Sequence, residues 1–408
     1  MKILHVISQT PDFTGSGKFI RQIIRHARQQ GHDNFLLAGC QDDFHLPEEL
    51  IPGDRAVLVR FGSRDLPFPV AGMSDAMPYD STVFSHMTPA ELDTYKTVFR
   101  TKISMAVEQF RPDLIHSHHL WIVSAIARDK APDLPMVTTC HGTCLRQHRF
   151  CGHISREITP ALEQIDRVMA LSGDQQAEII ERFGFREKRV PVMAGGYNEA
   201  LFTPGSKPDN AVVEMVYAGK LCRAKGVPWM LKSLARIKHL PFRLHLAGGG
   251  SGAEKETCLA LAEDLGDRAV YHGALPHKEL AALMGRSHLF LLPSFFEGVP
   301  LVLMEALACG CRILSTDLPG AKEILSGPDN RMVRFLHLPV LETIDMPFTS
   351  DEPVLEARLA DALKDLIVDI LEDPVPDHTF VEEKTRPYTW EKVFKRIEAV
   401  YESALSGR

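Results

Sequence analysis

The most constraining feature of this 408-residue sequence is the continuous stretch 294–310, which follows an apolar run at 289–292. The run has the length and composition of a strand that is buried on both faces of a sheet. Glu297 and Gly298 then predict a turn, and Pro300 suits a first helical residue because its φ is fixed. The apolar helix that follows should end at Gly310, because glycine caps a helix without steric strain.

Two carboxylates, Glu297 and Glu305, stand in this apolar stretch. On a helix they lie about 12 Å apart along the axis and within about a quarter turn, so both can face one groove. The free N–H groups and positive dipole end near Glu297 form a ready phosphate site. A carboxylate, an anion site and a second carboxylate match a sugar, a diphosphate and a ribose. Either glutamate alone is explained as well by a helix cap or a structural ion pair, but the combination favours a ligand.

Length and composition predict a cytoplasmic protein of two domains. A chain of 408 residues can bury two cores of ordinary size, and a net charge of −7 gives no reason to expect nucleic-acid binding. No secretory signal and no apolar run near the roughly 20 residues of a membrane span are apparent. The eight cysteines are therefore expected to be reduced thiols.

A location at the inner membrane surface stays open. Arg21, Arg25 and Arg28 could make a peripheral contact there, and could equally form a solvated helix face.

Strand and helix patterns alternate in both halves of the chain, which predicts an α/β protein with two Rossmann-like, doubly wound parallel-sheet domains. In the first half a strand at 3–7 leads to a turn containing Gly15, Ser16 and Gly17, and a helix from Phe19 follows. That turn lacks the full dinucleotide fingerprint, so a plain tight turn is an equal reading. Residues 40–100 are irregular and predict either a substrate-specific insertion or a surface excursion.

Glycine-rich turns in two such domains suggest a nucleotide-linked substrate, and at this point the sequence resembles a family. It is similar to the retaining glycosyltransferases of family 4, also called group 1, over nearly the whole chain. The resemblance is carried by Glu297 to Glu305 with Gly298, by Cys140-His141-Gly142, by Gly219-Lys220-Leu221 with Lys225-Gly226, and by Tyr388-Thr389-Trp390-Glu391.

The resemblance implies the GT-B fold, in which two Rossmann-like domains face a central cleft. It implies an acceptor-binding domain at 1–195, joined by a C-terminal helix at 388–408. A domain that binds the nucleotide sugar is expected at 196–387.

The resemblance also implies three catalytic residues. Lys225 would neutralise the charge that builds on the departing phosphate. Glu297 would accept hydrogen bonds from hydroxyls of the donor sugar, and His141 would contact that sugar near the reaction centre.

Further donor-binding residues are implied around them. Lys220 stands where many relatives carry arginine, so it keeps the charge but loses the bidentate fork. Glu305 would hold the ribose hydroxyls. The remaining positions would line the sugar, the diphosphate or the base: Gly15, Ser16, Gly17, Gly249, Ala274, Gly298, Val299 and Leu301.

The segment 143–155 is expected to be an ordinary or acceptor-binding loop. Arg146 and Arg149, together with His118, are candidates for an anionic acceptor, although solvated surface arginines are the simpler reading. The spacing of Cys140, Cys144 and Cys151 fits no standard zinc module, so no metal site is predicted.

The sequence thus predicts a metal-independent, retaining hexosyltransferase without a cofactor. Its donor would be a nucleotide sugar, with UDP the expected nucleotide, and its acceptor a polysaccharide precursor, a lipid-linked glycan or a small molecule. Two alternatives stay open: an enzyme like the GT-B-fold UDP-N-acetylglucosamine 2-epimerase, and a non-catalytic subunit that binds a sugar nucleotide.

Overall fold

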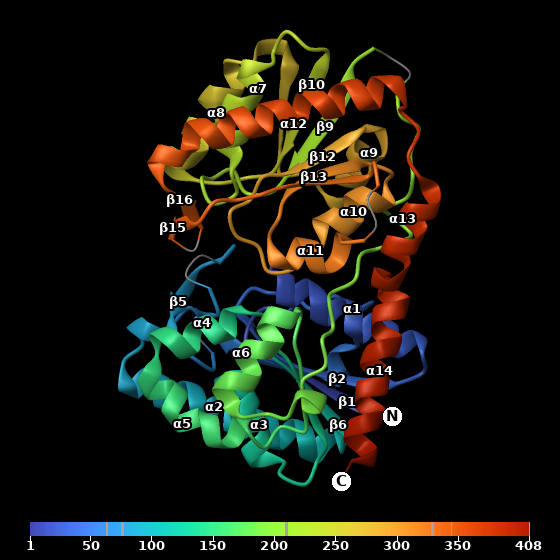
Figure 1. Cartoon of the computed structure of the whole chain (residues 1–408). Helices are drawn as coiled ribbons and strands as arrows, with labels where there is room; N and C mark the ends of the chain where they lie inside the picture. The colour runs from blue at the N-terminus through green and yellow to red at the C-terminus, as the bar shows by residue number, and fades with distance from the viewer. Residues whose placement is uncertain (63, 75–76, 209–210, 328–329, 344, 408) are drawn as a thin grey trace. The chain divides into compact units, whose positions relative to one another are not determined.

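The computed structural model describes residues 1–62, 64–74, 77–208, 211–327, 330–343 and 345–407. The chain divides into two compact units: unit 1 is Met1–Gly195 with Trp390–Arg408, and unit 2 is Gly196–Thr389. Each unit is one parallel sheet with helices on both faces (Figure 1). Residue 408 of the predicted helix 388–408 lies outside the described residues.

The sheet of unit 1 has six parallel strands in the order β3-β2-β1-β6-β7-β8. Its central strands are buried on both faces, as a doubly wound sheet requires, and β6 buries His116, Ser117 and His118 beside its apolar residues. The strands are β1 (Lys2–Ile7), β2 (Asp33–Gln41), β3 (Ala56–Phe61), β6 (Leu114–His118), β7 (Met136–Thr139) and β8 (Arg167–Met169); a separate two-stranded sheet pairs β4 (Val70–Gly72) with β5 (Ser81–Val83).

The helices of unit 1 cover both faces of this sheet. One face packs against α1 (Gly15–Gln29) and the C-terminal helix α14 (Trp390–Ser406), whose Tyr401 is fully buried. The helices α2 (Pro89–Phe110), α3 (Ile122–Lys130) and α5 (Gly152–Leu162) contribute to the core of the other face, with α4 (Thr143–Phe150) and α6 (Gly173–Phe183) beside them.

Unit 2 repeats the same topology, with six parallel strands in the order β11-β10-β9-β12-β13-β14. In each six-stranded sheet, the strand that comes first in the sequence lies beside the strand that comes fourth: β1 beside β6, and β9 beside β12. The topological switch point of each sheet lies between these two strands. The strands are β9 (Val213–Ala218), β10 (Phe242–Ala247), β11 (Ala269–Gly273), β12 (Leu289–Leu292), β13 (Arg312–Thr316) and β14 (Val333–Leu336).

Helices α7 (Val227–Arg236), α8 (Gly252–Glu263) and α12 (Glu352–Glu372) contribute to the core on one face of this sheet. Helices α9 (His277–Arg286), α10 (Val302–Ala308), α11 (Pro319–Leu325) and α13 (His378–Thr385) contribute to the other. A small hairpin, β15 (Leu341–Thr343) with β16 (Met346–Pro347), precedes α12.

The predicted pair of doubly wound parallel sheets is confirmed, and three local expectations need correction. The irregular region 40–100 contains β3, the edge strand of the unit 1 sheet. The expected loop 143–155 is helical, because α4 and α5 occupy most of it. Helix α10 begins at Val302 and not at Pro300, since the preceding residues form tight turns in which Leu301 N–H donates to the Val299 carbonyl oxygen (3.0 Å).

Among the described residues, none of the helices combines the length and the apolar character needed to cross a membrane.

The turn before α7 depends on a glycine, which gives a stability test. Gly226 has φ +67, and a Cβ there would fall on the Pro293 carbonyl oxygen; Gly266 has φ +59 with nothing within 4 Å. Both Gly226→Ala and Gly266→Ala should lose about 1–2 kcal/mol to left-handed strain. Gly226→Ala should lose roughly a further 1–3 kcal/mol to the clash. Urea denaturation followed by circular dichroism measures both, and equal losses would contradict the packing described here.

Candidate functional site

The predicted donor residues of unit 2 lie at the carboxyl ends of its strands. The loop after β9 carries Lys220 and Lys225, and the loop after β12 carries Glu297. Because β9 and β12 are neighbours in the sheet, these two loops flank the switch point. In open α/β sheets ligands bind in the crevice at this position.

Lys225 and Glu297 meet between the two loops. Lys225 Nζ lies 2.7 Å from Glu297 Oε1, and it also donates to the Phe296 carbonyl oxygen at 3.3 Å. Ser294 Oγ donates to the same Glu297 Oε1 at 2.8 Å. Both partners of the carboxylate are therefore on Oε1, and Oε2 forms no hydrogen bond with the described residues. The side chains of Lys225 and Glu297 are 30% and 17% exposed, so the pair is open to a ligand.

Backbone contacts fix the two loops against each other. Phe295 N–H donates to the Ala224 carbonyl oxygen at 3.0 Å, and Thr316 Oγ1 donates to the Ser294 carbonyl oxygen at 2.6 Å. The first bond joins the residue before Lys225 to the loop that carries Glu297. The second joins Ser294 to the last residue of β13. The Lys225–Glu297 pair thus stands on a rigid base.

The glycine-rich turns of unit 2 interlock in the same way. Gly219 N–H donates to the Ala247 carbonyl oxygen (2.9 Å), and Leu221 N–H donates to that of Gly249 (2.7 Å). A Cβ on Gly248, whose φ is +151, would fall on the Gly219 carbonyl oxygen. The turns after β9 and β10 therefore pack backbone against backbone.

The other predicted donor positions of unit 2 differ in exposure. The Lys220 side chain and Ala274 are exposed, and Glu305 on α10 is partly exposed. Gly298 and Val299 lie in the turn before α10 and face solvent at least in part. The N–H group of Leu301 is engaged with Val299, so in this structure it does not point at an empty site.

In unit 1 the predicted turn forms the start of α1. Thr14 caps the helix by accepting from Gly17 N–H at 3.0 Å, and Gln9 Nε2 donates to Ser16 Oγ at 2.8 Å. A Cβ on Gly17 would overlap the Asp12 backbone, which explains that glycine by packing. Gly15 is exposed, and a Cβ added to it would meet nothing within 4 Å.

His141 lies just after β7, and its ring stacks on that of the buried His118. Its Nε2 lies 3.1 Å from His118 Nδ1, and the two rings stack with an interplanar angle of 19°. Burial and the neighbouring imidazoles of His119 and His116 hold the pKa of His141 well below its usual value. His141 is therefore neutral at neutral pH and can exchange a single ring proton.

His118 needs correction as an acceptor-binding candidate. It is only 1% exposed and contacts His141 through Nδ1, so it does not meet a ligand directly in this structure. Of the two arginines, Arg149 pairs with Glu178 at 2.8 Å and Arg146 lies over the Phe150 ring at 5.2 Å.

One group of three potential metal ligands was missed from the sequence. His5, His116 and His118 bring ring nitrogens within 4.8 Å of one another, because β1 and β6 pair in register. Both nitrogens of His116 are already engaged, one by the Tyr401 hydroxyl (2.7 Å) and one by Thr139 Oγ1 (2.8 Å). The His116 and His118 rings also stack at 4.4 Å, and this orientation does not let their lone pairs converge on one ion. We therefore assign no metal to this group.

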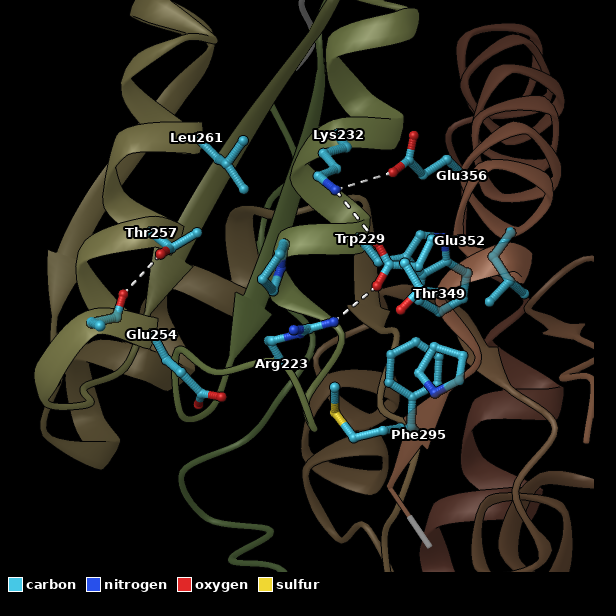
Figure 2. A pocket seen from close by; sticks show the side chains of 15 residues that line it. Arg223, Trp229, Lys232, Glu254, Thr257, Leu261, Phe295, Thr349, Glu352 and Glu356 are labelled. Carbon is cyan, nitrogen blue, oxygen red and sulfur yellow. Dashed lines mark hydrogen bonds and ion pairs between the residues drawn. The ribbon is translucent and has the colours of Figure 1, made fainter. Parts of the chain in front are cut away.

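A cavity of about 540 Å³ in unit 2 lies beside the loops but does not contain the pair. Trp229 and Phe295 stack in its wall at 5.2 Å, and Arg223 bonds Glu352 at its rim (Figure 2). Its lining among the described residues includes neither Lys225 nor Glu297. The cavity thus borders the two loops through Arg223 and Phe295, and the Lys225–Glu297 pair lies outside its lining.

Two family models match consecutive parts of the chain. The model described as Glycosyltransferase Family 4 matches residues 13–201, and the model described as Glycosyl transferases group 1 matches residues 204–333. Glycogen synthase of Mycobacterium tuberculosis (strain H37Rv) is 26% identical over 382 residues, covering 88% of this chain and 89% of that protein. D-inositol 3-phosphate glycosyltransferase 1 of Catenulispora acidiphila is 25% identical, covering 72% and 73%.

Solved structures share the fold over the whole chain. Sucrose-phosphate synthase from Thermosynechococcus elongatus superposes with a TM-score of 0.68 at 17% identity, covering 100% of both chains. Anabaena HepE in complex with UDP-glucose superposes with a TM-score of 0.66 at 17% identity, covering 99% of this chain and 100% of that one.

The doubled 3-2-1-4-5-6 sheet and these solved structures define the GT-B fold, and the two family models identify the chain as a glycosyltransferase. The chain belongs to the group 1 glycosyltransferases.

The histidine cluster of unit 1, which is buried except for the partly exposed His141, predicts a loss of stability in acid. Burial lowers the pKa of His5 to about 4 and holds those of His116, His118 and His141 well below the usual value. Unfolded histidines take up protons below about pH 6.5, and these folded ones do not. The free energy of unfolding should therefore fall as pH drops from 6.5, by up to about 1.4 kcal/mol per pH unit for each histidine.

Urea denaturation at pH 7.5, 6.5 and 5.5 measures this slope. His116→Gln should reduce it, whereas His86→Gln, which changes an exposed side chain, should leave it unchanged. A free energy of unfolding that is constant over this range would contradict neutral, buried imidazoles.

Proposed function

We propose that this glycosyltransferase moves a hexose from a UDP-hexose to a hydroxyl acceptor, with retention at the anomeric carbon and without a metal ion. The proposed donor is supported by the similarity to HepE, which was crystallised with UDP and with UDP-glucose. The proposed acceptors are a polysaccharide precursor, a lipid-linked glycan or a small molecule. They are supported by relatives named for glycogen and for inositol phosphate.

The observation that carries the proposal is that both contacts of the Glu297 carboxylate involve the same oxygen, Oε1. Lys225 and Ser294 both contact Oε1, which orients the carboxylate and leaves Oε2 for a hydroxyl of the donor sugar. A carboxylate accepts hydrogen bonds only, so it suits a sugar hydroxyl that donates.

Lys225 is suited to the diphosphate at the same time. An ammonium group has three N–H donors, and two are directed at Glu297 and the Phe296 carbonyl oxygen. The third is left for a phosphate oxygen, and the exposed Lys220 of the same loop adds a second charge. Positive charge held here stabilises the phosphate as the glycosidic bond breaks, which makes a metal ion unnecessary.

Retention follows if the acceptor attacks from the face that the phosphate leaves. The departing phosphate oxygen would then take the proton of the acceptor hydroxyl, so no protein nucleophile is required. Glu305 is assigned to the ribose hydroxyls, and His141 keeps the contact with the donor sugar that the resemblance implies.

A donor panel tests the proposal directly. The protein is incubated with UDP-glucose, UDP-galactose and UDP-N-acetylglucosamine, and UDP release by slow hydrolysis is followed. We expect release from one donor, and Glu297→Gln should slow it by at least about 100-fold because a transition-state contact is lost. Glu254→Gln changes an exposed carboxylate that lines the neighbouring cavity and has no contact with Lys225 or Glu297; it is the matched control and should keep the wild-type rate.

Other products would redirect the proposal. A 2-epimerised sugar would indicate an epimerase, and tight binding without turnover for any acceptor would indicate a non-catalytic binding subunit. An inverted anomeric configuration in the transferred sugar, read by NMR, would exclude attack from the leaving-group face.

Chelation tests the absence of a metal. Because Lys225 and Lys220 supply the charge that a divalent ion would otherwise provide, UDP release should be the same with and without EDTA. A loss of release in EDTA that magnesium or manganese restores would contradict the proposal.

A further inference from the structure

Two cysteine thiols lie on either side of His141 and touch each other. Cys140 directly follows β7 and Cys144 lies in the first turn of α4. Their Sγ atoms are 3.3 Å apart, and both residues are 0% exposed. Within the described part of the chain, no other two cysteines form a hydrogen bond with each other. A disulfide has an S–S length of about 2.05 Å, so closure needs a movement of only about 1.3 Å.

The two thiols differ in acidity, which assigns their order of reaction. Burial opposes ionisation of Cys144, but the Cys140 thiol and the His119 imidazole outweigh it and lower the pKa of Cys144 below the usual value. Burial and the adjacent Cys144 raise the pKa of Cys140 above the usual value. Cys144 also lies near the positive end of the α4 dipole. The position of Cys144 in the first turn of α4, together with the direction of its pKa shift, favours Cys144 as the attacking thiolate and Cys140 as the resolving thiol.

Access through the turn between them suits a small oxidant. The turn between the two thiols consists of His141, Gly142 and Thr143, and all three are partly exposed. Gly142 has φ +81. This turn therefore separates the thiol pair from solvent on one side. Hydrogen peroxide is close in size to water and needs only a small opening of the turn. A tripeptide disulfide such as oxidised glutathione is too large to reach sulfurs that are fully buried.

We propose that Cys140 and Cys144 are a modification site at which hydrogen peroxide forms a reversible disulfide, and that this disulfide lowers sugar transfer by displacing His141. The second half of the proposal rests on the proposed function, and the first half does not.

The oxidation is balanced in two steps. The Cys144 thiolate attacks one peroxide oxygen, the O–O bond breaks, and hydroxide leaves and takes up a proton as water. Cys140 then attacks the sulfur of the resulting sulfenic acid, the S–S bond forms, and the second oxygen leaves as water. Two thiols lose two electrons and one peroxide becomes two waters. A small dithiol such as dithiothreitol reverses the reaction by disulfide exchange.

The disulfide acts on His141 because that residue lies inside the closed ring. Drawing Cys140 and Cys144 together changes the backbone of the three residues between them. His141 lies 3.1 Å from His118 through its Nε2 and packs edge-on against the Phe19 ring at 5.2 Å, and a shift of the order of 1 Å disturbs both contacts. Misplacement by that distance is enough to lower an enzymatic rate by up to about 100-fold.

Mass spectrometry of the full-length protein tests the modification. After brief exposure to hydrogen peroxide, the protein should lose the mass of two hydrogen atoms, and peptide mapping should link Cys140 to Cys144. Cys140→Ser and Cys144→Ser should not form this link. Cys151→Ser, which changes another buried cysteine of the same region, should form it as the wild type does. Oxidised glutathione should leave the wild type unlinked.

The result that overturns the site is a peroxide-treated wild type without the 140–144 link. If the Cys140 and Cys144 variants fail to fold, alkylation of the wild type still decides the question: both thiols are alkylated after unfolding in the reduced sample, and neither in the oxidised one.

UDP release from the active donor tests the consequence. It should fall at least about tenfold in the oxidised wild type and in the oxidised Cys151→Ser variant, which forms the same link, and dithiothreitol should restore it in both. A linked protein with an unchanged rate would overturn the effect on His141. An absence of UDP release before oxidation would instead count against the proposed function, and the mass measurement would still decide the disulfide.

Discussion

The contact between Lys225 and Glu297 is the interaction on which the site depends. It exists because β9 and β12 are neighbours in unit 2 although about 70 residues separate them in the chain. The parallel sheet thus brings a cation and a carboxylate to the same edge, at the place where helices diverge to the two faces. Backbone bonds between the two loops hold this contact, so an ion pair of modest strength by itself acquires a defined geometry.

Much of the fold follows from patterns that are local in the chain. The run 289–292 is apolar at every position and became β12, and α2 begins at the Thr88 cap with Glu91 closing the capping box. The edge strand β3 was missed because only one of its faces is well buried, so Ala56–Phe61 reads as a mixed segment among prolines. Helix α4 was missed because Cys144 and His148 supply its buried face, and these residue types indicate chemistry more readily than packing.

The sequence singled out Lys225 and Glu297, which the structure brings together, but it could not predict the contacts that they make. Spacing placed Glu297 near a turn, but no pattern along the chain shows that Ser294 and Lys225 share one of its oxygens. The histidines of unit 1 show the same limit. Their arrangement depends on the register of β1 against β6 and on the Tyr401 hydroxyl, which comes from the far end of the sequence.

The place of α14 has a consequence for synthesis of the chain. This helix covers a face of unit 1, yet Trp390–Ser406 are translated only after all of unit 2. A nascent chain therefore carries an uncovered apolar face on its first sheet, with His116 lacking its tyrosine partner, while nearly two hundred further residues emerge. Unit 1 is the first unit to be synthesised, but it is complete only when α14 has been translated. Until then its partly uncovered sheet is the kind of exposed apolar surface that chaperones bind.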